Sequence, residues 1–307
     1  MKNFSLFILL ISCIFLTVQA VGQSPNDAIY MKSGTLCILG AYGQSSWREY
    51  WENELKRENL NIGTNTTTSY MMMVAVGLSS KLNLIAGLPY IQTHNSAGNL
   101  LGQKGFQDFS ATLKYKIYHR NGVSLSAALG ASVPVSNYVP DFLPMSIGMH
   151  SLSATGRIIF NYQHKTGLYL TLHGGYTGRS DITVDRDAYQ AYDHVYNTRT
   201  VAIPNTTDGA IQIGYLKHGI QATVFIEKFD CLGGDNIRRN DMPFPTNDMN
   251  GTDIGGYLKY QPSHFGVNFR YAYVTQGHNI GQATSFSAGI LYQFGFKAMH
   301  QAETENK

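Results

Sequence analysis

The feature that most constrains the fold of this chain is an alternating pattern within residues 105–135. From Phe109 to Ile117 every second residue is apolar, and the residues between them are polar or charged. After a turn at residues 119–122 the alternation resumes and continues to Val133. Successive side chains of a strand point to opposite faces, so each arm of this hairpin has one apolar face. Each arm has about the ten residues with which a tilted strand crosses a bilayer. The segment predicts one hairpin of a transmembrane β-barrel.

Composition argues against two simpler classes of protein, an ordinary soluble domain and a helical membrane protein. Charged residues make up 14% of the 307 residues, well below the roughly 25% of ordinary soluble domains. Mean hydropathy is nevertheless only −0.16, and no segment after residue 20 has the roughly eighteen consecutive apolar residues of a membrane helix. A chain that is poor in charge and yet lacks such helices is typical of alternating barrel strands.

The same alternation predicts twelve strands in all. Besides the two arms of the hairpin, they span about 33–44, 66–78, 81–92, 148–163, 167–179, 207–217, 219–231, 251–261, 264–276 and 282–296. Short and long connections alternate along the chain, as in bacterial outer-membrane barrels with periplasmic turns and longer outer loops. A soluble antiparallel sandwich also alternates, but its outward face is polar and its strands have about five or six residues. The predicted fold is therefore an all-β, antiparallel, up-and-down transmembrane barrel with long outer loops.

The chain ends predict export. Residues 1–22 read as a secretory signal peptide, with Lys2 before an apolar run and small residues at its end. A lipoprotein signal at Cys13 is the alternative, but the apolar run continues past that cysteine. We expect residues 23–296 to form the barrel and residues 297–307 to form a polar tail. The expected location is the bacterial outer membrane, with membrane lipid as a partner and the barrel-assembly machinery as a partner during biogenesis.

Tyrosines occupy the places expected of two interfacial girdles. Those toward the loop ends are Tyr42, Tyr70, Tyr90, Tyr176 and Tyr273. Those toward the turns are Tyr162, Tyr215, Tyr260 and Tyr292.

The faces turned toward the lumen carry the candidate solute path. Its predicted residues are Asp108, Lys114, Lys116, Arg157, Glu227, Asp253, Lys259 and Arg270. Opposite charges can pair across the barrel and hold its shape, or they can form a ladder that sets the charge preference for solutes. Packing plus a narrow path is favoured, since buried charges are normally paired.

Within this set the cations are the stronger candidates for solute contact. They are Lys114, Lys116, Arg157 and Arg270, with Asp108, Glu227 and Asp253 as their expected counter-charges. The mild excess of Lys and Arg indicates anionic solutes such as aromatic acids. A formal net charge of +3 without a basic tract gives no indication of nucleic acid as a partner.

Two long loops, residues 180–204 and 233–250, are long enough to fold inward and constrict the mouth. Tyr189, Tyr192 and Tyr196 recur at helix-like spacing, so a short helix that stacks on aromatic solutes is one interpretation. The other interpretation is that these tyrosines only pack the loop.

Three short motifs resemble a known outer-membrane family. They are Leu88-Pro89-Tyr90, the run Gly105-Phe106-Gln107-Asp108-Phe109 leading into Leu113-Lys114-Tyr115, and Leu129-Gly130-Ala131-Ser132-Val133-Pro134, with Gly175-Tyr176-Thr177-Gly178 as a further match. The chain resembles the family of the meta-pathway of phenol degradation, related to long-chain fatty-acid and aromatic-hydrocarbon channels. The resemblance covers roughly residues 80–180. The sequence departs from the family at Gln107, where Gly is usual, and at Val135-Ser136, where Thr-Gly is usual.

The resemblance implies passive uptake of small hydrophobic or aromatic molecules. The segment before the first strand has only about ten residues, which is too short for the N-terminal hatch of the fatty-acid channels. The predicted function is accordingly an outer-membrane channel or transporter without a cofactor.

Two alternatives to a channel remain open. A structural or adhesin-like barrel conducts nothing, and solute entry separates it from a channel. A barrel lipid hydrolase needs Ser, His and a third polar residue together at the lipid-facing rim, whereas the mid-strand His173 is predicted to point inward. A metal site is not expected, since the turn histidines lie too far apart to share one ion: these are His119, His164, His218 and His264.

Overall fold

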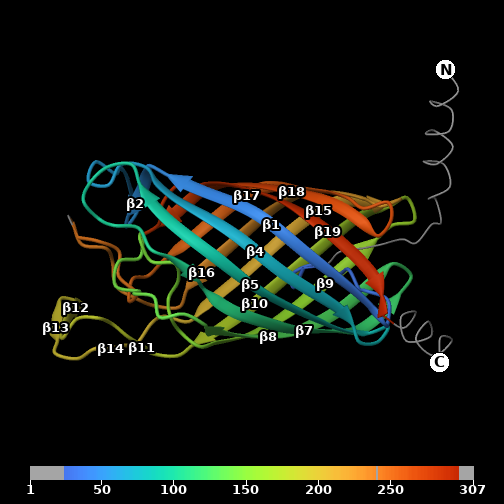
Figure 1. Ribbon diagram of the computed structural model, residues 1–307, viewed down its shortest axis with the longest axis horizontal. Helices are drawn as coiled ribbons and strands as arrows, with labels where there is room; N and C mark the ends of the chain where they lie inside the picture. The colour runs from blue at the N-terminus through green and yellow to red at the C-terminus, as the bar shows by residue number, and fades with distance from the viewer. Residues whose placement is uncertain (1–23, 240, 297–307) are drawn as a thin grey trace, which may run out of the picture.

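The computed structural model describes residues 24–239 and 241–296, and within them twelve long strands close into an antiparallel barrel (Figure 1). Each long strand pairs with the next one along the chain, and β1 pairs with β19 to close the barrel. The predicted fold class is confirmed. The strands are β1 Thr35–Trp47, β4 Asn65–Gly77, β5 Leu82–Asn95, β7 Asp108–Arg120, β8 Val123–Pro134, β9 Ser153–Gln163, β10 Leu168–Arg179, β15 Thr206–Lys217, β16 Ile220–Cys231, β17 Asn250–Tyr260, β18 Phe265–His278 and β19 Thr284–Gly295.

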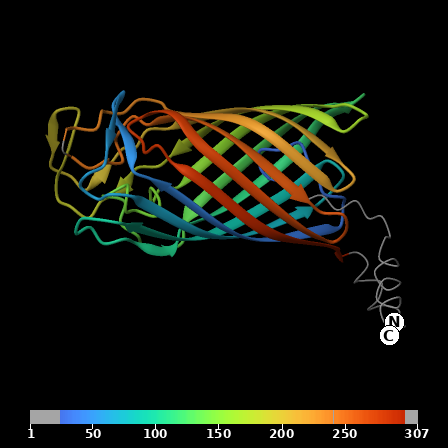
Figure 2. The same ribbon diagram turned by 90° about the horizontal axis from the view of Figure 1, so that it is seen from above.

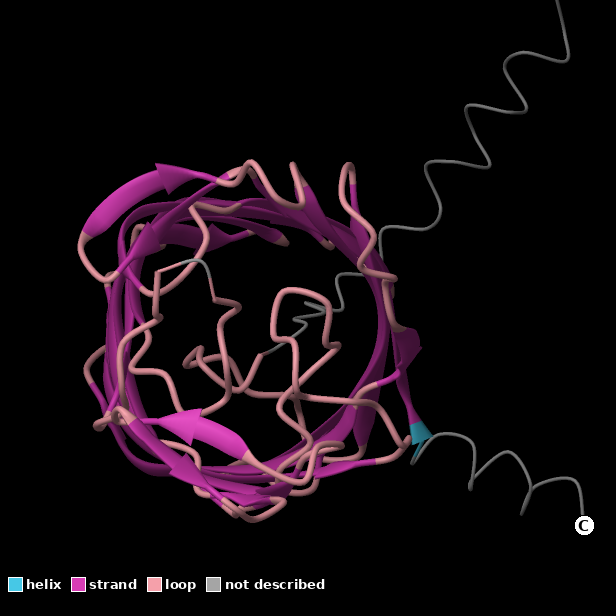
Figure 3. Ribbon diagram, turned by 90° about the vertical axis from the view of Figure 1, so that its left-hand side faces the viewer, coloured by secondary structure: helices cyan, strands magenta, loops and turns pink. Residues whose placement is uncertain are grey.

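Short turns lie at one end of the barrel and the long loops at the other (Figures 1 and 2). The first residue of β1, Thr35, pairs with the last residue of β19, Gly295, at the turn end. Seen from the loop end, several connections lie across the circle formed by the strands (Figure 3). The remaining strands all belong to the long loops: β2 Glu49–Glu52, β3 Leu55–Glu58, β6 Lys104–Phe106, β11 Ile182–Thr183, β12 Tyr189–Ala191, β13 His194–Tyr196 and β14 Thr200–Val201.

Of the two interpretations of the tyrosine-rich part of residues 180–204, the short helix is wrong. Tyr189 and Tyr196 instead pair across a small hairpin formed by β12 and β13. Its two turn residues, Tyr192 and Asp193, have φ angles of 49° and 61°. Two consecutive residues with positive φ are incompatible with a helix and match the favoured two-residue hairpin turn. In the described residues, no helix is long and apolar enough to cross a membrane.

The exposure of side chains is inverted relative to a soluble protein. Large apolar side chains such as Met72, Leu129 and Val224 are exposed on the outside of the barrel, whereas Asn83 and Gln261 are completely buried. Contiguous apolar surface of this extent requires an apolar surrounding, and a closed barrel leaves no strand edge unpaired within a bilayer. The alternation therefore places the apolar faces outward, as predicted.

Aromatic side chains form a continuous row on the outer surface near the loops. Tyr42, Tyr70, Tyr90 and Phe106 are neighbours across β1, β4, β5 and β6. Successive ring centroids are 5.6, 6.5 and 5.4 Å apart. Such rings are typical of the level where the hydrocarbon of a membrane meets the headgroups.

The inner wall has two unlike sides, which the sequence pattern did not predict. On β1, β4, β5 and β19 the inward residues form an apolar strip, consisting of Cys37, Ala75, Ile85 and Leu291, with Leu39 and Met73 beside them. The inward residues of β7 to β10 and β15 to β18 are mostly polar. The polar inward face of the hairpin of β7 and β8 does not extend to the apolar strip on β1, β4, β5 and β19.

Candidate functional site in the barrel lumen

A short segment before β1 folds into the turn-side part of the lumen and binds Lys114 (Figure 2). The Lys114 ammonium donates to the carbonyl oxygens of Ser24 at 2.9 Å and Asp27 at 3.0 Å, and to Asp27 Oδ1 at 2.8 Å. These contacts use all three N–H donors of the ammonium. The Lys114 side chain has no exposed surface, so its charge is neutralised within the barrel and not by solvent.

The Asp27 carboxylate also holds the segment in its folded shape. Its Oδ1 accepts from the backbone N–H of Ile29 at 2.8 Å, and its Oδ2 accepts from that of Ser24 at 2.5 Å. A side chain that bonds to its own neighbouring backbone stabilises a compact turn. The same carboxylate therefore shapes the segment and attaches it to the wall.

Two further side chains of the segment contact opposite sides of the lumen. The Tyr30 ring centroid lies 5.0 Å from Lys114 Nζ and 4.3 Å from Lys116 Nζ, within the range of cation–π attraction. Met31 packs against the apolar strip and is almost fully buried. We call residues 24–31 the plug. The segment is as short as the sequence indicated, yet it reaches both the cationic and the apolar wall.

A second cation, Arg157, is paired with residues of the barrel wall. Its guanidinium donates to Asp208 Oδ2 at 2.5 Å and Oδ1 at 2.9 Å, and its Nη1 lies 2.7 Å from His173 Nδ1. Arg157 and Asp208 are on β9 and β15, and Gly175 of β10 stands between them in the register. A Cβ on Gly175 would lie 3.0 Å from Asp208 Oδ1 and 3.2 Å from Arg157 Cζ. The missing side chain is thus what lets the pair reach across β10.

The third cation, Arg270, reaches over β17 in the same manner. Its Nη2 donates to Glu227 Oε2 at 2.5 Å, and its guanidinium lies 4.5 Å from the centroid of the Phe225 ring. Asp253 lies opposite Glu227 in the ladder of β16 and β17. One guanidinium therefore faces two neighbouring carboxylates, of which it binds Glu227.

The predicted lumen residues all lie on the inner wall, but their pairing differs from the expectation. Asp108 is not the counter-charge of a lumen cation, because it accepts a hydrogen bond from Tyr138 Oη at 2.6 Å. Burial and the neighbouring Asp108 raise the pKa of the Tyr138 phenol, which keeps it a donor. Lys116 contacts the plug through Tyr30, and Lys259 is almost fully buried.

Sequence reasoning missed the residues that neutralise two of the cations. Asp208 was not selected, although the alternation of β15 puts it on the same face as Gln212. Asp27 and Tyr30 precede the first strand and follow no periodic pattern. Only the folded barrel brings Asp27 to Lys114, so no local signal identifies that pair.

At the loop end, the predicted tyrosines pack against each other and a neighbouring loop. The rings of Tyr189 and Tyr196 stack with centroids 5.1 Å apart, and Tyr189 also stacks on Phe244 at 5.5 Å. The guanidinium of Arg186 lies between the rings of Phe142 and Phe244, at 5.3 and 5.1 Å from their centroids. These contacts join three outer loops, while Tyr192 remains exposed.

The histidine considered for a hydrolase does not lie where such a site would need it. His173 points into the lumen, where its Nδ1 contacts Arg157, and it does not lie at the lipid-facing rim. Within residues 24–239 and 241–296, no group of three or more His, Cys, Asp or Glu side chains is placed to hold a metal ion.

Comparison with known proteins identifies one matching family. Residues 56–217 match the family described as "Putative MetA-pathway of phenol degradation". No curated protein has a sequence that matches this chain.

Several solved structures of outer-membrane barrels are similar. The COG4313 outer membrane channel from Pseudomonas putida F1 has a TM-score of 0.67 at 13% identity, over 90% of this chain and 100% of that chain. The NanC porin has a TM-score of 0.47 at 10% identity, over 84% of this chain and 98% of that one. The TodX monoaromatic hydrocarbon channel has a TM-score of 0.44 at 10% identity, over 89% and 93%. At 13% identity, the likeness to the COG4313 channel shows a shared fold.

Proposed function

The chain belongs to the family described as a putative MetA-pathway of phenol degradation, since more than half of its 307 residues match that family, and from this premise we propose that it is an outer-membrane channel for small aromatic molecules, with aromatic carboxylates as its favoured solutes. It works without catalysis or a cofactor. The short turns and the plug face the periplasm, as in the general plan of bacterial barrels. Residues 1–22 are the signal peptide that directs export; they lie outside the described residues, as does the polar tail.

One observation carries this proposal: residues 24–31, which precede β1, lie inside the lumen and are held to its wall at Lys114 by non-covalent contacts. A barrel with a purely structural role can fill its interior with side chains of its own wall, as eight-stranded barrels do. Here the plug is attached through the Lys114 ammonium, which forms one ion pair and two hydrogen bonds to carbonyl oxygens, and through the Tyr30 ring and Met31. Contacts of this kind can be exchanged for solute contacts, because a solute that carries a carboxylate and a ring offers the same chemistry.

The two-sided wall suits such a solute. The apolar strip around Cys37 and Ile85 offers contact area for a ring, and Lys114 and Lys116 across the lumen attract a carboxylate. Sites for small organic molecules typically combine a mainly apolar lining with a few placed polar groups. We propose that a carboxylate solute entering from the loops competes with Asp27 for Lys114 and releases the plug.

Uptake into proteoliposomes tests the proposal. We expect benzoate to enter vesicles that contain the protein several-fold faster than benzamide, its neutral counterpart. Lys116→Gln should lower benzoate entry and leave benzamide entry unchanged, because Lys116 has a ring contact but no carboxylate partner among the described ion pairs. Lys228→Gln is the matched control, since Lys228 is an exposed lysine near the loop end of β16 that pairs with Asp230 of the same strand.

Two results would contradict the channel function. Entry of both compounds at the rate of protein-free vesicles would favour a non-conducting structural barrel. Release of fatty acid from the vesicle lipid, with loss of that release on His173→Ala, would favour a hydrolase.

A further inference from the structure

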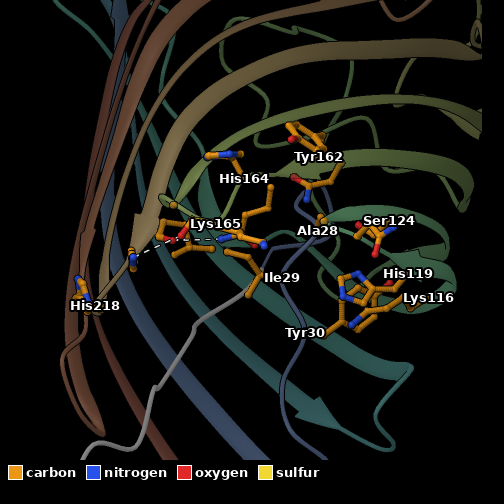
Figure 4. Close-up of a pocket in the computed structure, with 18 of the residues that line it drawn as sticks. Ala28, Ile29, Tyr30, Lys116, His119, Ser124, Tyr162, His164, Lys165 and His218 are labelled. Atoms are coloured by element: carbon orange, nitrogen blue, oxygen red, sulfur yellow. Dashed lines mark hydrogen bonds between the residues drawn. The ribbon is translucent and has the colours of Figure 1, made fainter.

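A cavity of about 980 Å³ lies on the other side of the plug, between it and the short turns (Figure 4). Ala28, Ile29 and Tyr30 of the plug form its inner boundary. The turn residues His164, Lys165 and His218 stand around the opening. We call this cavity the vestibule. It is separate from the Lys114 contact, which lies within the barrel and has no exposed surface.

Every charged side chain that lines the vestibule, among the described residues, is a lysine. Its lysines are Lys116, Lys165, Lys217 and Lys259, and three histidines lie among them. None of the described residues that line it is Asp or Glu. The one carboxylate of the plug, that of Asp27, is bound to Lys114.

The lysines come from different parts of the wall, so they surround the cavity. Lys116 lies on β7, Lys217 ends β15 and Lys259 lies on β17, whereas Lys165 belongs to the turn after β9. Lys217 Nζ lies 3.4 Å from the carbonyl oxygen of Lys165, which joins two neighbouring turns at the rim. An anion with a single charge can meet only one or two of these groups at once.

The arrangement also offers neutral hydrogen-bond donors. Asn121, Asn161 and Gln163 line the vestibule between the lysines, and side-chain amides donate through their NH₂ groups. Like charges in a concave wall of low dielectric add up to a potential that concentrates counter-ions. Such a wall favours ligands with several acceptor oxygens.

We propose that the vestibule is a binding site for small anions that carry two or more carboxylate or phosphate groups and that reach it from the periplasmic side. Such an anion binds between Lys116 in the interior and Lys165 and Lys217 at the rim. It lies against the plug, because Tyr30 both lines the vestibule and contacts Lys116. The site requires no passage of solute through the barrel.

Titration calorimetry of the purified protein at low salt tests the proposal. The probes are trimesate for polycarboxylates and pyrophosphate for phosphates, with benzamide as a neutral control. We expect saturable binding of at least one of the two anions, weakened by added salt as for any contact between exposed charges. The double substitution Lys165→Gln and Lys217→Gln should weaken that binding about tenfold, the effect of losing two exposed charge contacts.

The matched control replaces two exposed lysines at the same end of the barrel that do not line the vestibule, Lys32→Gln and Lys81→Gln. Affinity should stay within about twofold of the native value. Binding of trimesate alone assigns the site to carboxylates, and binding of pyrophosphate alone assigns it to phosphates.

An equal loss of affinity in both double variants would overturn the proposal, because binding would then reflect overall charge. The absence of saturable binding to either anion would overturn it as well. Calorimetry does not depend on conduction, so a protein that binds the anion and admits no solute contradicts only the channel function. A protein that admits solute but binds neither anion contradicts only the proposed anion site in the vestibule.

Discussion

At the scale of single residues, the lumen cations differ in how their charge is neutralised. Lys114 depends on a carboxylate outside the barrel wall, that of Asp27, whereas Arg157 is paired within the wall with Asp208. The first pair can separate when the plug moves, but the second is fixed by its strands. Alternation alone predicted that Lys114 and Arg157 point inward, because the strand period determines the face. It could not supply Asp27, whose position depends on a chain reversal before β1.

The ion pair of Arg157 and Asp208 leads to a prediction about stability. Asp208→Leu should destabilise the folded barrel by about 2 kcal/mol, less than for a fully buried pair because Asp208 keeps part of its surface exposed. The barrel loses stability in this variant because the Arg157 charge is left buried without its carboxylate partner. The double variant Arg157→Leu and Asp208→Leu should therefore lose less stability than Asp208→Leu alone.

Denaturant unfolding in detergent micelles, followed by heat-modifiable mobility, measures the stability of Asp208→Leu, of Arg157→Leu and of the double variant. If the double variant lost the sum of the two single losses, the pair would contribute no coupling and this interpretation would be wrong.

At the scale of strands, inward glycines let side chains reach the second strand away. Gly175 stands between Arg157 and Asp208, and Gly214 of β15 plays the same part for Tyr169, which hydrogen bonds to Thr223. A Cβ on Gly214 would lie 2.8 Å from the Tyr169 ring. Strand positions were predictable from the apolar outward face, since lipid selects that face strongly. The inward glycines were not, because a glycine fits either face and its partner is set by the register of three strands.

Neighbouring glycines of β10 provide a matched test. Gly175→Val should push Arg157 and Asp208 apart and lower the unfolding free energy by about 1–2 kcal/mol, the usual cost of overpacking. Gly174→Val should be tolerated, since a Cβ there points to the outside and lies no closer than 3.8 Å to another heavy atom outside its chain neighbours. Equal destabilisation by both substitutions, in the same unfolding assay, would mean that the strand simply requires glycine.

At the scale of the whole molecule, the barrel is a shell whose outer face suits lipid and whose interior is divided by the plug. The loops stand on one side of that division and the cationic vestibule on the other (Figures 1 and 4). The sequence predicted the shell because its pattern repeats twelve times. The division depends on residues 24–31, which carry no periodic signal and acquire their role only by contact with Lys114, Lys116 and the apolar strip.

The central claim, a channel closed by the plug, is tested most directly by the current through single proteins in a planar bilayer. Asp27→Asn removes the charge that binds Lys114 and keeps the shape of the side chain. Since a hydrogen bond between charged groups contributes about 1.5–3 kcal/mol, the ratio of open to closed time should rise about tenfold or more. The exposed loop variant Asp185→Asn should behave as the native protein does. A folded, heat-modifiable Asp27→Asn barrel that stays as closed as the native protein would contradict the account.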